Sequence, residues 1–278
     1  FLPWAASMLD RYSSDPTFSI ASGCNKLGTW GEPGADHLRA QRGSIWGWAS
    51  TATTWHAARA LDLADIAAAP SSSGTEPGLA RVVDPLVSRQ TALVLEEVRK
   101  GRAIAWDTEF SARCHLMGRT AAISTVNLIS NRGVGPDATR TKYEDDFVAT
   151  LPSRANVGAP SNSGVAPATG AGGGPSTGTS GGTAPAPSAA SGYDRASLLA
   201  ELLGRCVNPD MALRLARVVA ANPKAPIDEA TRLHLEPFLH LEESLGLLDH
   251  LAHQGVESPQ FERVRATLRR SCGARAER

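Results

Sequence analysis

The segment 155–192 constrains this chain more than any other feature, because it separates two zones of very different composition. It holds no charged and no aromatic residue, and consists mostly of Ala, Gly, Ser, Pro and Thr. Such a segment buries too little apolar surface to offset the entropy lost when its backbone is ordered. We therefore predict a disordered linker over 155–192, between a first folded part at 1–154 and a second at 193–278.

The overall composition excludes several classes of function. The 28 Lys and Arg residues balance 28 Asp and Glu residues, so we expect neither nucleic acid nor an anionic membrane surface as the main partner. No apolar run approaches the length of about 18 residues that a membrane span needs. The four cysteines form no CxxC pair, which predicts reduced, mostly buried thiols. We expect a cytoplasmic protein, with a peripheral position at the inner membrane as an alternative.

The first part, 1–154, has the mixed pattern of an α/β domain. Near the N-terminus, Trp4, Met8 and Tyr12 recur every four residues, which predicts a helix with one apolar stripe. Strands are expected where apolar and small residues alternate. In order, we predict a helix within 1–12, a strand within 17–22, a loop from 43 that becomes helical near Thr51, an amphipathic helix over 86–101 and an extended segment over 121–130.

The second part, 193–278, predicts a small all-α module. It is rich in Leu, Ala, Arg and Glu, and its twelve basic and twelve acidic residues show no bias toward nucleic acid. Asn208 and Ser258 are suited to capping helices that open with a proline. We expect about four helices, at 194–204, 209–222, 227–254 (broken near Pro237 in one alternative) and 259–271. No motif assigns this module a role.

By local chemistry, the candidate site is "AWDTEF" at 105–110. Asp107 and Glu109 would share a face of a strand but not of a helix. One interpretation makes Asp107 a base in a cleft beside aromatic rings. The other makes it the N-cap of a helix that begins at Thr108. The two interpretations are compatible, because a capping carboxylate at the edge of a cleft can also meet substrate.

Four blocks of the sequence carry a family resemblance. They are "FLPWAASMLDRYSSDPTFSIASGCN", "IWGWASTATTW", "WDTEF" and "NLISNRGVGPDATRT", and they span residues 1–141. In this order they resemble blocks of bacterial nucleotide-diphospho-sugar glycosyltransferases of the GT-A superfamily, family 2-like enzymes of which some are labelled hemolytic-type proteins. The resemblance implies that 1–154 is the C-terminal, acceptor-side part of a Rossmann-like GT-A domain.

The resemblance implies hexosyl transfer from a nucleoside-diphosphate sugar to a hydroxyl of a glycan, a lipid-linked acceptor or another acceptor. Asp107 matches the family's acidic residue and is expected to act as the general base of an inverting reaction. Family members use a divalent metal, Mn²⁺ or Mg²⁺, on the diphosphate. Its acidic motif would precede Phe1, so we expect this chain to be a fragment, inactive by itself, with the main metal ligands outside it and no metal ligand within.

The resemblance also assigns residues to substrate. Trp46, Gly47 and Trp48 would border the acceptor cleft, although both indoles could instead fill the core beneath it. The remaining substrate-binding candidates are Glu109, Asn127, Asn131 and Arg140. Arg140 replaces a histidine of the family pattern; it cannot ligate a metal but can bind phosphate in a bidentate manner. For the two asparagines, fixing the loop backbone is the alternative role.

Two other hypotheses stay open. A non-catalytic binding or scaffold protein would join a decayed transferase domain to a helical interaction module. A sugar-phosphate nucleotidyltransferase on a similar fold is the third possibility. The lone histidines, among them His37, His56 and His115, are expected to be structural or to lie on the surface.

Overall fold

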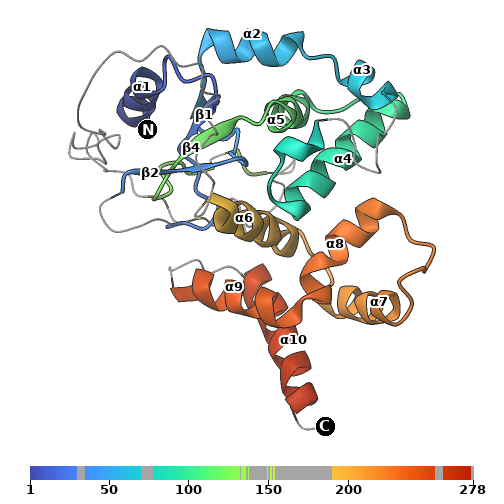
Figure 1. The fold of residues 1–278 in the computed structure, drawn as a ribbon. Coiled ribbons are helices and arrows are strands. Elements are labelled where there is room, and N and C mark those ends of the chain that lie inside the picture. The colour runs from blue at the N-terminus through green and yellow to red at the C-terminus, as the bar shows by residue number, and fades with distance from the viewer. Residues whose placement is uncertain are drawn as a thin grey trace, which may run out of the picture.

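The structure of the chain is a computed structural model (Figure 1). It describes residues 1–29, 35–69, 78–131, 133–135, 137, 149, 151, 153, 190–253 and 259–276. Residues 155–189 of the predicted linker lie outside the described residues, as does Arg140. Residues 190–192 belong to a helix, so the prediction that the linker extends to 192 was wrong at that end.

A four-stranded mixed sheet forms the centre of the α/β part, which confirms the predicted fold class at this level. The strands are β1 (Phe18–Ser22), β2 (His37–Ala40), β3 (Trp48–Ala49) and β4 (Thr120–Ser124), in the order β2-β4-β1-β3. Only β1 and β4 pair in parallel, whereas β2 and β3 join as antiparallel edge strands.

Helices cover both sides of this sheet and form the C-terminal region (Figure 1). In the first part they are α1 (Leu2–Arg11), α2 (Ala52–Ala60), α3 (Leu63–Ala68), α4 (Pro85–Arg99) and α5 (Trp106–Leu116), with a 3₁₀ turn, η2, at Leu79–Arg81. In the second part they are α6 (Ala190–Gly204), α7 (Pro209–Ala221), α8 (Glu229–Leu239), α9 (Leu241–His253) and α10 (Pro259–Ala276).

The predicted elements are confirmed where sequence signals are local. Thr51 caps α2 by accepting from the Thr54 amide at 3.1 Å, and Asn208 caps α7 by accepting from the Met211 amide at 3.0 Å. The helix predicted over 227–254 divides at His240, and Pro237 lies inside α8. Strands β2 and β3 were not predicted.

The two faces of the sheet belong to different apolar clusters. Along β4, Ala122 packs under α1, while Ala121 and Ile123 face the opposite cluster, as the alternation of a strand requires. Along β1, Phe18 and Ile20 also lie in different clusters, contrary to simple alternation. A register shift between Phe18 and Ala21 explains this, because it turns the side chains that follow to the other face.

Helix α6 joins the C-terminal helices to the sheet (Figure 1). Its Leu203 and Ala200 share an apolar cluster with Ile123 of β4, and its Leu198 packs in the cluster of α3 and α4. Asp194 accepts hydrogen bonds from the backbone amides of Gln41 and Arg42, at 3.0 and 2.7 Å. The helices after the linker are therefore continuous with the core of the α/β part. No helix among the described residues is both long and apolar enough to cross a membrane.

We predict that Leu198→Ala on α6 destabilises the α/β part. Leu198 is fully buried, and such a truncation costs about 2–5 kcal/mol of unfolding free energy. All six tryptophans lie before residue 107, so urea denaturation followed by tryptophan fluorescence reports on the α/β part alone.

The control is Val207→Ala, because Val207 is 81% exposed and its truncation should change the free energy by less than about 0.5 kcal/mol. A fluorescence transition that stays in place while the helical circular dichroism of Leu198→Ala shifts would contradict the shared core.

Candidate functional site

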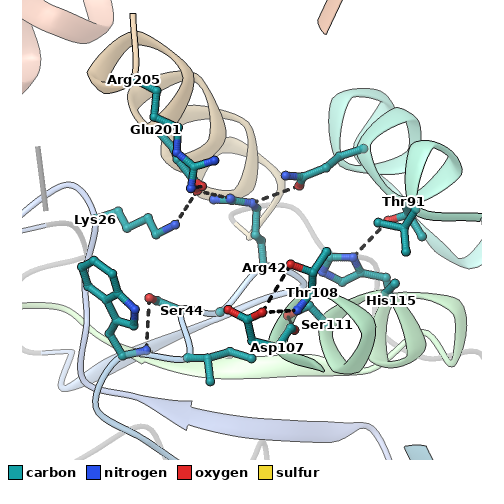
Figure 2. Close-up of a pocket in the computed structure, with 16 residues that line it drawn as sticks. Lys26, Arg42, Ser44, Thr91, Asp107, Thr108, Ser111, His115, Glu201 and Arg205 are labelled. Carbon is teal, nitrogen blue, oxygen red and sulfur yellow. Dashed lines mark hydrogen bonds and ion pairs between the residues drawn. The ribbon is translucent and has the colours of Figure 1, made fainter. Parts of the chain in front are cut away.

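A cavity of about 530 Å³ lies where α4, α5 and α6 meet the loop before β3 (Figure 2). Its lining is part apolar, from Ile45, Trp46 and Val94, and part polar, from charged and hydroxyl side chains. A volume of this size suits a small organic ligand. Because α6 contributes one wall, both parts of the chain build the cavity.

Asp107 lies at this cavity in the first turn of α5, where Figure 2 shows it beside Thr108 and Ser111. Its Oδ1 accepts from the Thr108 amide at 2.8 Å, and the Ser111 hydroxyl donates to the Asp107 carbonyl at 2.8 Å. A carboxylate is favoured at this end of a helix because the unpaired amides carry partial positive charge. The N-cap itself is Ala105, so the prediction that Asp107 caps a helix beginning at Thr108 was wrong by two residues.

The tryptophans of 46–55 divide between the cavity and an aromatic cluster. Trp46 lines the cavity, and its amide donates to the Ser44 hydroxyl at 3.4 Å. Trp48 instead packs against Trp55, Trp106 and Phe110, with ring centroids 5.7–6.4 Å apart. Both indoles are partly buried and pack against the same apolar cluster, and Trp46 in addition lines the cavity.

A chain of ion pairs forms the wall opposite Asp107 (Figure 2). Lys26 and Arg42 both bind one oxygen of Glu201 on α6, and Arg205 binds the other at 2.5 Å. Burial alone would raise the pKa of Glu201, but the charges of Arg42, Lys26 and Arg205 outweigh it and hold that pKa well below its usual range. Glu201 is therefore ionised at neutral pH, and its charge binds three cations at one place.

His115 lies at the inner end of the cavity and is buried. Its Nδ1 lies 3.0 Å from the hydroxyl of Thr91, which also donates to the Val87 carbonyl. Burial, reinforced by the charge of Arg42, lowers the pKa of His115 to about 4. The imidazole is therefore neutral at neutral pH, as expected for a histidine held inside the core.

Gly47 and Glu109 lie outside the lining of the cavity. Gly47 adopts φ +57°, its carbonyl accepts from the Gly23 amide at 2.8 Å, and a Cβ on it would come within 2.1 Å of Ile129. Glu109 is two residues from Asp107 on α5 and therefore points to a different side of the helix, where it forms an ion pair with Arg113. The structure thus brings together Asp107 and Trp46 among the predicted site residues.

The two asparagines hold the loop that follows β4. Asn127 is buried, and its Nδ2 donates to the Ile129 carbonyl at 2.8 Å, while Asn131 accepts from the Gly133 amide at 3.0 Å. These contacts match the alternative in which both fix the loop backbone.

The group of Lys26, Arg42, Arg205 and Glu201, here called the cationic wall, was not predicted, whereas His115 has the structural place expected of it. Lys26, Arg42 and Glu201 lie far apart in the chain and belong to no motif, so no local signal links them. The spacing of Asp194 and Glu201 on one predicted helix face was the available hint, since two buried acids on an apolar face need partners. Within the described ranges, no group of three or more His, Cys, Asp or Glu side chains is placed to hold a metal ion.

Comparison with known proteins adds no identity. No protein-family model, no curated protein and no solved structure matches this chain at a significant level.

We predict that Gly47→Ala destabilises the fold more than Gly101→Ala. Both glycines have φ near +60°, so an alanine is strained at either position. Only at Gly47 does the new Cβ also collide with Ile129, whereas nothing lies within 4 Å at Gly101. Urea denaturation should therefore separate the two variants by at least about 1 kcal/mol, and equal losses would remove the steric contribution.

We also predict that His115 makes stability fall as the pH drops from about 6.5 to about 4. In this range the imidazole of His115 is protonated in the unfolded chain but not in the folded chain, so lowering the pH favours unfolding. The contribution is about 3 kcal/mol across the window. Buried Asp194, whose pKa is raised to about 6 by burial, acts in the opposite direction, so the comparison must be made against a variant.

That variant is His115→Gln, with His56→Gln as the control for loss of an exposed imidazole. Unfolding free energies measured between pH 4 and pH 7 should depend less on pH in His115→Gln than in the wild type. An unchanged slope in His115→Gln would contradict the pKa lowered by burial.

Proposed function

We propose that this protein takes part in glycosyl transfer, moving a hexose from a nucleoside-diphosphate sugar to an acceptor hydroxyl with inversion. The observation that carries the proposal is the position of Asp107 and Trp46 at one cavity. These are the residues that the family resemblance assigns to the base and to the acceptor cleft. They come from separate sequence blocks, so nothing in their spacing requires them to meet.

The chemistry of the cavity supports acceptor binding. The indole of Trp46 offers an apolar surface for the C–H face of a sugar ring, and the hydroxyls of Ser44, Thr108 and Ser111 can exchange hydrogen bonds with sugar hydroxyls. Among the described residues that line the cavity, Asp107 supplies the anionic group on this side. A hydroxyl bound here lies within reach of a base.

The proposed step is a single displacement. The Asp107 carboxylate takes the proton of the acceptor hydroxyl while its oxygen forms a bond to the anomeric carbon. The bond from that carbon to the diphosphate oxygen breaks, and the nucleoside diphosphate leaves with the electron pair. The described residues hold no group of three or more His, Cys, Asp or Glu side chains placed for a metal ion, and the proposed step is written with the residues of this cavity alone.

We predict that Asp107→Asn lowers the rate of transfer by about 10²–10⁴-fold, because the amide cannot accept the proton. The assay uses the protein expressed from its whole reading frame, a panel of labelled nucleotide sugars and glycan acceptors, and buffers with and without Mn²⁺. The control is Asp65→Asn, since Asp65 also lies in the first turn of a helix but is exposed on α3.

A rate for Asp107→Asn close to that of the wild type would remove Asp107 from the role of base. If no donor is consumed by the wild-type protein, the non-catalytic binding hypothesis becomes the better account, and glycan binding by the cavity is then the quantity to measure.

A further inference from the structure

The proposed function uses the Asp107 side of the cavity and leaves the wall on the α6 side without a role. Three cationic side chains, Lys26, Arg42 and Arg205, line that wall with a single carboxylate, Glu201. Three positive charges and one negative charge leave a net charge of +2 there. Including Asp107, the whole lining still carries +1, because the lowered pKa of His115 keeps it neutral.

Burial makes this surplus costly. The side chains of Lys26 and Arg42 are 16% and 10% exposed, so water screens their charges poorly. Burial lowers the pKa of Lys26, and the neighbouring charge of Arg42 lowers it further, while Glu201 opposes both. A second anion placed between these groups would relieve the repulsion.

The cations also keep hydrogen-bonding capacity for a ligand. An ammonium has three donors, and within the described part of the chain the Lys26 ammonium donates to Glu201. Arg42 is held in place by Gln90 and Ser197, both at 3.4 Å, which orients its guanidinium. Arg205 lines the same cavity, and its side chain is 58% exposed, so it is also accessible to a ligand.

The cavity therefore has two unlike sides, one carboxylate with hydroxyls and one cationic wall (Figure 2). We propose, on the basis of the proposed function, that the acceptor is a phosphorylated sugar whose phosphate binds Lys26, Arg42 and Arg205 while a hydroxyl faces Asp107. Phosphate matches the guanidinium fork in geometry, and a cavity of about 530 Å³ accommodates a monosaccharide phosphate.

A diphosphate of the sugar donor offers the same chemistry, so the probes must separate the two sources. Isothermal titration calorimetry at low salt compares glucose 6-phosphate, glucose, inorganic phosphate and uridine diphosphate. We expect glucose 6-phosphate to bind at least about tenfold more tightly than either glucose or inorganic phosphate, because it engages both sides of the cavity.

The variants are Lys26→Gln and Arg205→Gln, each expected to weaken glucose 6-phosphate about tenfold without changing the affinity for glucose. Arg195→Gln is the control, since Arg195 lies on α6, outside the cavity lining, and pairs with Glu243 at 2.8 Å. Arg205 is exposed, so Arg205→Gln should fold even if Lys26→Gln does not.

Three results would overturn the inference. These are equal affinities for glucose and glucose 6-phosphate, an equal loss in Arg195→Gln, or a preference for uridine diphosphate that depends on Lys26 and Arg205. The last would assign the wall to the donor. Calorimetry needs neither a donor nor turnover, so its outcome is independent of the transfer assay on Asp107→Asn.

Discussion

The attachment of α6 to the edge of the sheet determines both the fold and the cavity. Asp194 accepts hydrogen bonds from the backbone amides of Gln41 and Arg42, which come just after β2. About two helical turns later, Glu201 forms ion pairs with Lys26 and Arg42. Desolvation offsets most of the attraction in buried ion pairs, so their net contribution to stability is small. The leucines of α6 supply the apolar burial, and the two carboxylates fix where the helix lies. Because Glu201 also lines the cavity, the fold and the site form together.

Local signals in the sequence were enough for most helices and for β1 and β4. Proline in the first turn, a capping side chain and a regular apolar spacing act within one or two turns, so they can be recognised without tertiary information. Strands β2 and β3 are too short to carry such a signal. His37–Ala40 alternates in polarity over only four residues and Trp48–Ala49 shows no period, so pairing with β4 and β1 decides their conformation. The packing of α6 against the core of the first part was not predicted either, because composition alone indicated two separate parts.

The candidate site was half predictable for the same reason. Asp107 and Trp46 stand in recognisable blocks, and both line the cavity. Trp48 stands in the same block as Trp46 but packs in an aromatic cluster with Trp55, Trp106 and Phe110. Gly47 lies between the two tryptophans with φ +57°, so the backbone there is not extended and the two indoles need not share a face. The concentration of tryptophan at 46–55 therefore serves two purposes, one indole for the cavity and two for packing. The cations and Glu201 could not be found, since their meeting depends on how α6 lies on the sheet.

This division matters for how function and specificity arise in the chain. In the proposed function, the residues that resemble a glycosyltransferase would supply the base and the aromatic surface, which are requirements common to any sugar acceptor. The cationic wall lies outside the resembling motifs: Lys26 directly follows the first block, Glu201 lies on α6, and Arg205 directly follows α6. A fold supports a reaction class, whereas the side chains around a site select the substrate. If the proposed function holds, the C-terminal helices would influence acceptor choice, because any change in how α6 lies would move Glu201 and Arg205, and with them the charge opposite Asp107.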